Sequence, residues 1–454
     1  PAIMDAVRDS GLAHLLAISG LHIGLVSGIL FFGLRGLLAL LPPLALKFPI
    51  KKWAAFAAIL GAFAYAMVSG ATVPTQRAFL MVGLVLLAVL LDRRGLSMRM
   101  VAWAAMAILV LRPESLLEAS FQMSFAAVTA LIAAYEFLRQ RRRLMGGGEP
   151  FTWRRTLVLY LAGVALTTLI AGTATAPFAV YHFDRLSAYG LAANLIAVPV
   201  TALWAMPWAV GAFALMPLGL EGLALAPMGW GLEVVIRVAQ TVSSWPGAVS
   251  VLPAMPTWGI ASVALGGLWL CLWRRRWRLW GVAGFAAGLA ALALVRPPDI
   301  LIDGQGKLLA VRAESGALTF SSLRRARFSR QTWLRRIGQE EAPTPWPSSG
   351  ASPDGRLSCD FMGCIYRAGG KVVALVRSPG ALAEDCLLAD VIVSTIPVKV
   401  SCPSPILVID RFDLWRHGAH ALWLEGGTVR VESADQLRGR RPWVVRRQRR
   451  QGGT

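Results

Sequence analysis

The chain has 454 residues, of which 56% are hydrophobic and only 16% are charged, with a mean hydropathy of +0.57. Because an ordinary soluble domain carries about 25% charged residues, this composition excludes a typical cytosolic enzyme, a disordered chain and a disulfide-dense mini-protein. Residues 1–298 hold 23 basic and 10 acidic residues with long charge-free stretches, whereas residues 299–454 hold 23 and 15 with ordinary mixing. The composition predicts a polytopic α-helical membrane domain over 14–298, followed by a soluble domain.

The formal net charge is +21, and this excess of Lys and Arg has two interpretations. A basic surface can bind nucleic acid. Membrane proteins, however, also collect Lys and Arg in their cytoplasmic loops for reasons of topology. On charge alone we favour the topological interpretation.

Ten stretches approach the length of a membrane-spanning helix, about 20 apolar residues. They are, in chain order, His14–Leu41, Trp53–Ser69, Pro74–Leu91, Arg99–Leu111, Ala119–Leu138, Thr156–Phe178, Tyr189–Met216, Gly222–Val242, Trp258–Trp273 and Leu279–Val295. Pro199 and Pro207 lie inside the seventh stretch, which can therefore break into two half-helices. Residues 1–13 are expected to form an outer N-terminal segment of a chain whose upstream part is missing.

Four basic clusters alternate with loops that carry few charges. The clusters are Lys47, Lys51 and Lys52; Arg93, Arg94 and Arg99; Arg139, Arg141, Arg142, Arg143, Arg154 and Arg155; and Arg274, Arg275, Arg276 and Arg278. With ten alternating spans all four clusters fall on one side, which the positive-inside rule assigns to the cytoplasm. This predicts a multi-pass protein of the bacterial cytoplasmic (inner) membrane whose C-terminal domain is periplasmic.

Several spans contain polar residues at a depth where such groups are costly. The candidates for the lining of a pore or DNA path are His14, Ser19, His22, Gln76, Arg77, Gln122, Ser124 and Asn194. Each residue alone is more simply explained as a hydrogen-bonding contact between neighbouring helices. Their convergence on the outer half of the membrane favours a polar cavity or pore.

Arg77 is the most demanding of these residues, because a lone guanidinium is costly inside a membrane. The predicted spans contain two carboxylates, Glu136 near the opposite end of its span and Glu233 in the eighth span. Arg237 lies four residues after Glu233 and is its more natural partner. We therefore expect water to solvate Arg77 in a path that opens to the outer side.

Five short motifs follow one another over most of residues 10–210. They are His14–Gly24, Pro74–Met81, Ser120–Val128, Thr175–Phe183 and Ala193–Pro199. Together they resemble the hallmark segments of the ComEC family, the inner-membrane channels of natural competence. The resemblance implies a channel that passes single-stranded DNA across the lipid bilayer. It also implies a periplasmic DNA receptor and a cytoplasmic motor or single-strand-binding protein as partners, and it leaves a homo-oligomer open.

Many members of this family carry a metallo-β-lactamase-like domain after the membrane core. Asp299–Gly306 resembles the opening of that domain, but the His-x-His-x-Asp-His cluster that two-metal hydrolysis needs is missing from the sequence. We therefore expect a degenerate domain over 299–437 that is not an enzyme and has no cofactor. The spacing of His417 and His420 could suit a metal on a helix, but Gly418 and the strand predicted after it favour a turn.

Short β-rich runs dominate the soluble domain and predict an α/β, β-rich fold. The predicted strands are Ile300–Ile302, Lys307–Val311, Cys364–Arg367, Lys371–Val376, Asp390–Thr395, Ile406–Ile409, Ala419–Leu424 and Thr428–Val431. Gly369 and Gly370 predict a hairpin turn between two of them. Gln331–Ile337 and Ala381–Leu388 predict short helices, and residues 341–356, rich in Pro, Ser and Gly, predict a loop.

Four cysteines lie in the soluble domain, without the Cys-x-x-Cys spacing of a zinc site. They are Cys359, Cys364, Cys386 and Cys402. In a domain outside the cytoplasm they predict disulfides, whose connectivity the sequence leaves open. The Arg-rich residues 438–454 predict a basic disordered tail, with contact to DNA phosphates or anionic head groups as the alternative.

Three further functions compete with a DNA channel. A secondary transporter of a small solute would also use broken helices and polar groups near the midplane. A membrane-anchored hydrolase is disfavoured by the missing metal cluster, and a membrane-anchored scaffold is the third alternative. The five motifs favour the channel. Because the sequence has no P-loop, a separate energy source is expected.

Overall fold

The computed structural model describes residues 2–16, 20–93, 97–145, 153–340 and 342–439, together with 441 and 444. Two compact units divide the chain. The helical unit comprises Pro1–Ser250 and Met255–Ala293, and the β-rich unit comprises Val251–Ala254 and Leu294–Thr454. The residues predicted as a separate outer segment, 1–13, thus belong to the helical unit. Most of the predicted basic tail lies outside the described residues.

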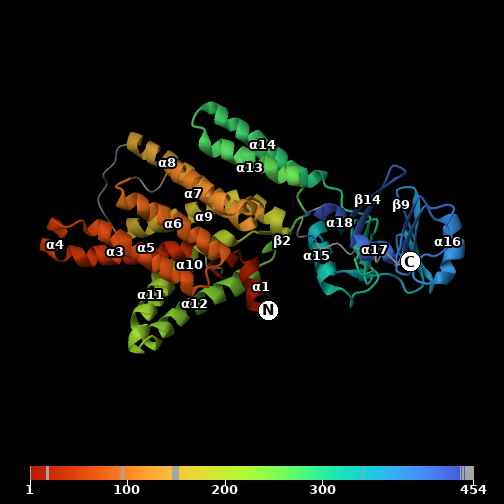
Figure 1. Ribbon diagram of the computed structural model, residues 1–454, viewed down its shortest axis with the longest axis horizontal. Coiled ribbons are helices and arrows are strands. Elements are labelled where there is room, and N and C mark those ends of the chain that lie inside the picture. Colours follow the sequence, from red (N-terminus) through yellow and green to blue (C-terminus); the bar gives the residue numbers. More distant parts are fainter. Residues whose placement is uncertain are drawn as a thin grey trace, which may run out of the picture. The chain divides into compact units, whose positions relative to one another are not determined.

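Helices make up most of the helical unit (Figure 1). They are α1 (Ala2–Asp9), α2 (Ala13–Leu16), α3 (Gly20–Ala39), α4 (Pro42–Lys47), α5 (Ile50–Val68), α6 (Val73–Leu90), α7 (Met98–Leu111), α8 (Ala119–Met145), α9 (Trp153–Phe183), α10 (Gly190–Val200), α11 (Met206–Leu215), α12 (Gly222–Ser243), α13 (Thr257–Leu272) and α14 (Trp280–Ala290). Within the described residues, 7 helical stretches are long and apolar enough to cross a membrane. Three shorter apolar helices, which correspond to α6, α7 and α13, occupy the remaining positions where spans are predicted.

The seventh predicted span is one continuous helix. A π-helical turn, Thr201–Ala205, joins α10 to α11, and the residues on both sides keep right-handed helical dihedral angles. Such a turn opens the helix locally and so accommodates the missing N–H groups and the ring clashes of Pro199 and Pro207. The predicted break into two half-helices is therefore not present.

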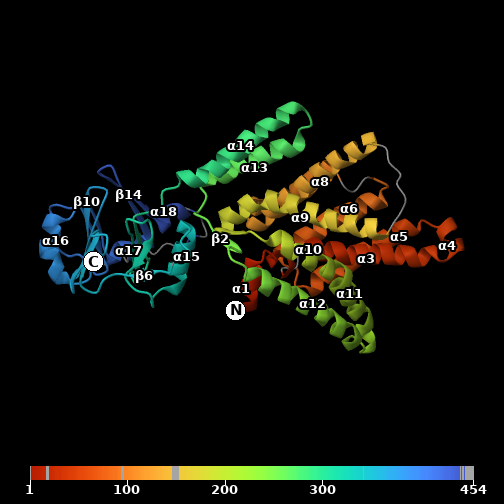
Figure 2. The ribbon, with the colours of Figure 1, turned by 180° about the vertical axis from the view of Figure 1, so that it is seen from behind.

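The helices α13 and α14 form an antiparallel hairpin and lie side by side in both views (Figures 1 and 2). Glycines let their backbones touch. A Cβ atom on Gly266 would lie 2.6 Å from the carbonyl oxygen of Gly281, and a Cβ atom on Gly288 would lie 2.5 Å from that of Gly259. Small residues of this kind are typical of close helix packing in membranes.

The β-rich unit contains two six-stranded sheets, with the orders β14-β13-β3-β4-β5-β6 and β12-β11-β10-β9-β8-β7. The strands are β3 (Ile300–Ile302), β4 (Leu309–Arg312), β5 (Leu318–Phe320), β6 (Thr344–Pro345), β7 (Gly350–Ala351), β8 (Leu357–Cys359), β9 (Gly363–Ala368), β10 (Lys371–Val376), β11 (Val391–Ser394), β12 (Leu407–Ile409), β13 (His420–Glu425) and β14 (Thr428–Ser433). Earlier in the chain, β1 (Arg185–Ser187) and β2 (Val249–Val251) form a separate two-stranded sheet.

All eight predicted strands are present, with ends within two residues of the prediction. Gly369 and Gly370 form the predicted hairpin turn between β9 and β10, with φ angles of +59° and +73° that L-residues rarely adopt. The structure adds β5 and β8, and it places β6 and β7 inside the predicted loop 341–356. These strands have two or three residues each, which is too short for an alternating pattern to show.

The two sheets pack face to face, and a helix covers each outer face. In β4, Leu309 and Val311 point into the core between the sheets, whereas Ala310 points to the opposite face, as the period of two in a strand requires. α15 (Arg327–Ile337) covers that opposite face, and α16 (Leu382–Leu388) covers the outer face of the second sheet. Two short helices, α17 (Arg411–His417) and α18 (Ala434–Arg438), complete the unit.

The short segment Val251–Ala254 links α12 to α13 along the chain but belongs to the β-rich unit. The Val251 N–H donates to Glu340 Oε1 at 3.1 Å, and the Ala254 N–H donates to the carbonyl oxygen of Arg336 at 2.9 Å. This segment is therefore bonded to the last turn of α15 and to the residues that follow it.

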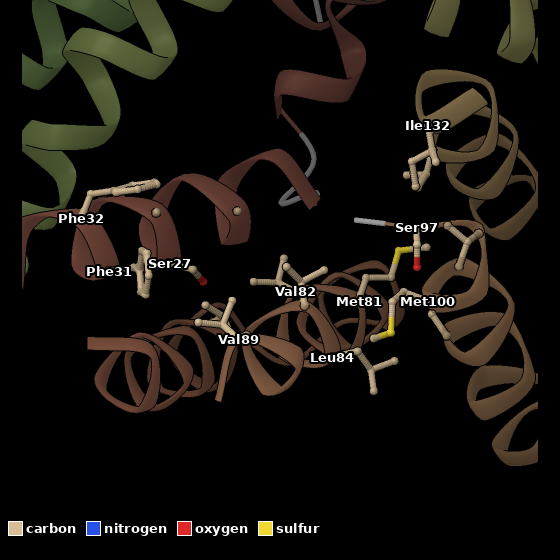
Figure 3. A pocket seen from close by; sticks show the side chains of 17 residues that line it. Ser27, Phe31, Phe32, Met81, Val82, Leu84, Val89, Ser97, Met100 and Ile132 are labelled. Atoms are coloured by element: carbon tan, nitrogen blue, oxygen red, sulfur yellow. The ribbon is translucent and has the colours of Figure 1, made fainter. Parts of the chain in front are cut away.

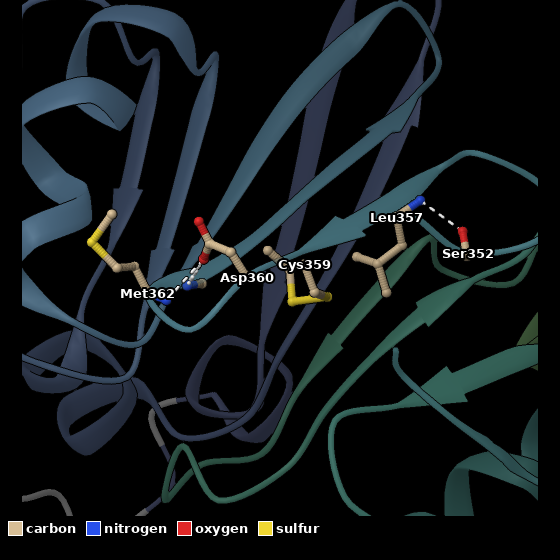
Figure 4. The surroundings of a disulfide bond; sticks show 7 residues. Ser352, Leu357, Cys359, Asp360 and Met362 are labelled. Atoms are coloured by element: carbon tan, nitrogen blue, oxygen red, sulfur yellow. Dashed lines mark hydrogen bonds between the residues drawn. A yellow bond between two sulfur atoms is a disulfide. The ribbon is translucent and has the colours of Figure 1, made fainter. Parts of the chain in front are cut away.

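The four cysteines pair within the β-rich unit. Cys359 bonds to Cys364 across the β8–β9 turn, and Cys386 of α16 bonds to Cys402. In the β8–β9 turn, Asp360 Oδ1 accepts hydrogen bonds from the N–H groups of Met362 at 2.8 Å and Gly363 at 2.7 Å (Figure 4). The side chain of Asp360 thus supports the turn that the disulfide closes.

We expect Gly266→Ala to lower the thermal stability of the detergent-solubilised chain, because the added methyl group must push α13 away from α14. Overpacking of this kind costs about 1–3 kcal/mol. Gly267→Ala is the matched control, since no atom lies within 4 Å of its Cβ position and Ala is the better helix former. Equal unfolding temperatures for the two variants would contradict packing through Gly266.

Candidate functional site

The starts of α6 and α8 meet the end of α9 at one end of the helical unit, which we call the polar end. Arg77, near the start of α6, donates from Nη2 to Ser120 Oγ in the first turn of α8. His182 Nε2, at the end of α9, donates to Gln122 Oε1 of α8 at 2.9 Å. Two side-chain hydrogen bonds therefore join these three helices where three of the five motifs lie.

The basic loops lie at the opposite end, which we call the basic end. Lys52 Nζ, at the start of α5, lies 2.8 Å from Asp92 Oδ2 just after α6. Arg274 Nη2, just after α13, lies 2.7 Å from Glu136 Oε2 late in α8. Since α6 and α8 start together at the polar end, both ion pairs lie at the other end, as the alternation of spans predicts.

Arg77 is buried, with 6% of its surface exposed. Nη2 donates to Ser120, but Nε and Nη1 have no hydrogen-bond partner within the described part of the chain. The Glu118 carboxylate interacts electrostatically with the guanidinium. Glu118 lies just before the predicted span Ala119–Leu138 and is therefore not among the carboxylates of the predicted spans.

The other predicted residues on α6 and α8 make mainly local contacts. Gln76 Nε2 donates to the carbonyl oxygen of Ala71 at 2.7 Å, and Gln122 Nε2 donates to that of Leu116 at 3.0 Å. Each bond ties the segment that precedes its helix, α6 or α8, to the first turns of that helix. Ser124 Oγ lies 4.0 Å from the sulfur of Met81, which makes it a weak contact between α8 and α6.

The remaining predicted residues lie on other helices. His14 of α2 is exposed, and its Nδ1 donates to the carbonyl oxygen of Gly11 at 3.2 Å. His22 is half-buried in α3, and Asn194 of α10 has a buried Oδ1 without a partner among the residues described. Ser19 lies outside the described residues. The hydrogen bonds around Arg77 and Gln122 therefore unite only part of the predicted set.

The N-terminal residues pack on the polar end instead of extending from it. Val7, Leu12 and Leu15 share one apolar cluster with residues of α10 and α12. Arg185 Nη1, just after α9, lies 3.2 Å from Asp9 Oδ1. Segment 1–13 is thus a structural part of the helical unit.

A cavity of about 520 Å³ lies between α3, α6, α7 and α8. Its walls are almost wholly apolar, and Phe31, Val82 and Met100 are among the side chains that line it (Figure 3). Ser27 also lines it, with a buried Oγ that has no partner among the described residues. None of the described predicted site residues lines this cavity. The polar end and the apolar cavity are therefore separate features.

Sequence reasoning misses three residues of the polar end, Glu118, Ser120 and His182. Ser120 and His182 lie inside quoted motifs, so the motifs carry the signal that could find them. They lie at helix ends, where water or head groups usually satisfy a polar side chain, so polarity alone does not single them out. Only the antiparallel packing of α8 and α9 brings His182 to Gln122.

The two histidines of the β-rich unit occupy different environments. His417 ends α17, whereas His420 begins β13 and is buried, with Nδ1 donating to the carbonyl oxygen of Gly418 at 2.8 Å. Burial lowers the pKa of His420 below its ordinary value. The predicted turn at Gly418 is present. Among the described residues, no group of three or more His, Cys, Asp or Glu could hold a metal ion.

The motif Asp299–Gly306 is tied into the structure by hydrogen bonds. Asp299 is 4% exposed and accepts from Arg312 and from the Leu424 N–H at 2.8 Å. Tyr366 donates from its hydroxyl to the carbonyl oxygen of Arg312 at 2.7 Å, and burial, aided by the Asp299 charge, raises the pKa of Tyr366 to about 12. Asp303 accepts from Ser329 Oγ at 3.0 Å. Both carboxylates therefore have structural partners.

These apolar helices and the β-rich unit after them define a multi-pass membrane protein with an additional β-rich domain. A family model described as "Competence protein" matches residues 1–277. The chain therefore belongs to the ComEC family of competence proteins, as its five motifs predict.

Relatives in three bacteria illustrate the similarity. The chain is 37% identical over 150 residues to "Competence protein ComA" of Neisseria gonorrhoeae, 28% over 217 residues to "ComE operon protein 3" of Bacillus subtilis (strain 168), and 27% over 326 residues to "Uncharacterized protein YcaI" of Escherichia coli (strain K12). These matches cover 31%, 48% and 66% of this chain, but only 20%, 24% and 42% of the relatives. No solved structure matches the chain.

We expect Arg77 and Ser120 to be energetically coupled. In a double-mutant cycle with Arg77→Met and Ser120→Ala, hydrogen-bonded neighbours show coupling of about 0.5–3 kcal/mol. The measurement is the shift in unfolding temperature of the detergent-solubilised chain. The control cycle pairs Arg77→Met with Ser124→Ala, because Ser124 contacts Met81 instead. Additive shifts in the first cycle would show that the hydrogen bond contributes nothing.

Proposed function

We propose that this chain forms a channel that passes single-stranded DNA across the cytoplasmic membrane during natural transformation. Membership in the competence family supports a role in DNA uptake. The observation that carries the finer proposal is Arg77, a buried arginine in an apolar helix with two unpaired guanidinium nitrogens in the described part of the chain. A buried cation with free donors is a binding element for an anion.

A DNA phosphate supplies the acceptors that Arg77 lacks. Its oxygens can accept from Nε on one edge of the guanidinium or from Nη1 on the other, while Nη2 keeps its bond to Ser120 and anchors the side chain. Gln122 and His182 add polar groups at the same end of the helices. Between phosphates, the Glu118 carboxylate partly compensates the charge of the guanidinium.

The positive-inside rule supports a cytoplasmic location for the basic end. The polar end then faces the periplasm and receives the DNA. Both chain links to the β-rich unit leave the helical unit after helices that run towards the polar end, α12 and α14. A periplasmic β-rich unit follows from this orientation, and its paired cysteines suit an oxidising compartment.

We propose that the β-rich unit is a degenerate metallo-β-lactamase-like domain without hydrolase activity. Its helix–sheet–sheet–helix layers support the fold assignment, and the structural partners of Asp299 and Asp303 support the loss of a metal site. A periplasmic receptor would then deliver DNA to the channel, and a cytoplasmic motor or single-strand-binding protein would supply the direction of import.

A secondary transporter of a small solute is the second candidate. The observation that favours it is the cavity between α3, α6, α7 and α8, whose volume of about 520 Å³ lies in the range of small-molecule sites. Its apolar walls would suit an apolar solute and not a polyanion.

Arg77→Ala is expected to reduce import of DNA into the cytoplasm at least about tenfold at equal protein level in the membrane, since a lost charge-assisted hydrogen bond costs about 1.5–3 kcal/mol. Arg77→Lys should restore import only in part, because an ammonium group cannot bond two phosphate oxygens as a fork. The readout is transformation of cells, with periplasmic DNA scored separately.

Arg237→Ala is the matched control, because Arg237 lies in α12 and pairs with Glu233 at 2.6 Å on an exposed surface. It should leave import unchanged. If Arg77→Ala imports DNA as well as the wild type does, Arg77 is no part of the DNA path.

A further inference from the structure

One stretch of the β-rich unit concentrates positive charge without any acidic residue. Residues 322–337 contain six arginines and no Asp or Glu. The arginines are Arg324, Arg325, Arg327, Arg330, Arg335 and Arg336, which lie in α15 and the turn before it. We call these arginines, together with Phe328, the α15 basic patch.

None of the six arginines forms an ion pair within the described ranges of the chain. Elsewhere in the same unit cations lie beside carboxylates: Arg356 Nη2 is 3.8 Å from Glu314, Lys371 Nζ is 3.2 Å from Asp390, and Arg416 Nη2 is 3.0 Å from Asp413. Two carboxylates lie nearby, Asp303, which accepts from Ser329, and Glu340, which accepts from the Val251 N–H. Neither forms an ion pair with an arginine of the patch, and two carboxylates are fewer than six guanidinium groups. The patch therefore carries a local positive charge that the fold does not neutralise.

Phe328 lies in the first turn of α15 and is 79% exposed. The apolar face of α15 is already buried, because Trp333, Leu334 and Ile337 pack on the outer face of the first sheet beside Phe320. Phe328 is thus an aromatic ring in water, directly next to the exposed Arg327. It contributes no core packing that would account for a large apolar side chain here.

We propose that the α15 basic patch binds a single-stranded nucleic acid, with arginines on the phosphates and Phe328 stacked on a base. This inference rests on the proposed function for its substrate class. Single-strand-binding surfaces combine a positive track with exposed aromatic rings, because every base offers a flat face for stacking. The patch would hold the incoming strand on the β-rich unit by contacts that need no metal and no hydrolysis.

The geometry favours a nucleic acid over a lipid surface. A helix that lies on a membrane inserts a broad apolar face among the acyl chains. In α15 that face is occupied by the protein's own sheet, which leaves Phe328 as the exposed large apolar side chain of this helix. One ring is enough to stack on one base, but it offers little area for insertion into lipid.

The test measures binding of a fluorescent 20-nucleotide oligothymidylate by the full chain in nanodiscs of neutral lipid. The variant combines Arg324→Gln, Arg325→Gln and Arg327→Gln, three exposed side chains. We expect affinity to fall about tenfold or more, and the slope of log affinity against log salt to fall by about 2, at about 0.7 per phosphate contact. Phe328→Ala should weaken binding about tenfold without changing the slope.

The matched control removes the same charge elsewhere in the unit, with Arg411→Gln, Arg416→Gln and Arg438→Gln, and should weaken binding less than about twofold. Equal losses in the two triple variants would overturn the proposal, because net charge alone would then explain binding. If the patch binds anionic lipid instead, the patch variant should bind the oligonucleotide as well as the wild type does. Nanodiscs with phosphatidylglycerol should then change the stability of the wild type but not that of the patch variant. This pair of results would also overturn the proposal.

The outcomes separate this inference from the proposed function. If patch variants bind normally while Arg77→Ala abolishes import, only the inference about α15 is wrong. If patch variants lose binding while Arg77→Ala imports normally, Arg77 is no part of the DNA path and the surface remains a nucleic-acid site.

Discussion

A guanidinium buried among apolar helices needs acceptors for all of its donors, and Arg77 meets this requirement only in part. Its bond to Ser120 holds the start of α6 on the start of α8, and Glu118 adds a compensating charge. The bond between His182 and Gln122 adds α9 to the same end. Since hydrocarbon offers no replacement partners, these few contacts determine where the helices meet. The two nitrogens of Arg77 that have no partner among the described residues connect this packing to the proposed function.

The β-rich unit solves the same electrostatic problem in a different way. Its buried charge, Asp299, is paired with Arg312 and bonded to the Leu424 N–H, and Tyr366 bonds to the same segment. Such a network is fully satisfied and therefore structural. The α15 basic patch departs from this pattern, because four of its six arginines are exposed and none forms an ion pair among the described residues. Arg77 and the α15 basic patch are the two places where this chain is proposed to meet a phosphate.

Patterns with a strong local cause could be predicted from the sequence. The strands of the β-rich unit, the glycine turn at Gly369 and Gly370, the ten apolar segments and the ion pair of Glu233 with Arg237 all follow from spacing or composition. The five motifs also identified the family. Each of these signals lies within about 20 neighbouring residues, where periodicity and propensity are informative.

Features that depend on distant contacts could not be predicted. The pairing of Arg77 with Ser120 and that of Gln122 with His182 join residues 43 and 60 positions apart. The π-helical turn at Thr201–Ala205 absorbs prolines that locally indicate a break. Of the candidate site residues, only Arg77 and Gln122 take part in these contacts, because polarity at depth does not show which face of a helix meets which neighbour.

The most direct test of the account is photo-cross-linking of DNA during import. In one variant, benzoylphenylalanine replaces Phe121, a buried residue that lies between Ser120 and Gln122 in the sequence. In the control variant it replaces Trp103, an α7 side chain that is 61% exposed. With donor DNA stalled by a bulky terminal block, the account predicts adducts at position 121 and none at position 103. Import that proceeds without any adduct at position 121, or with equal adducts at both positions, would contradict a DNA path through the polar end.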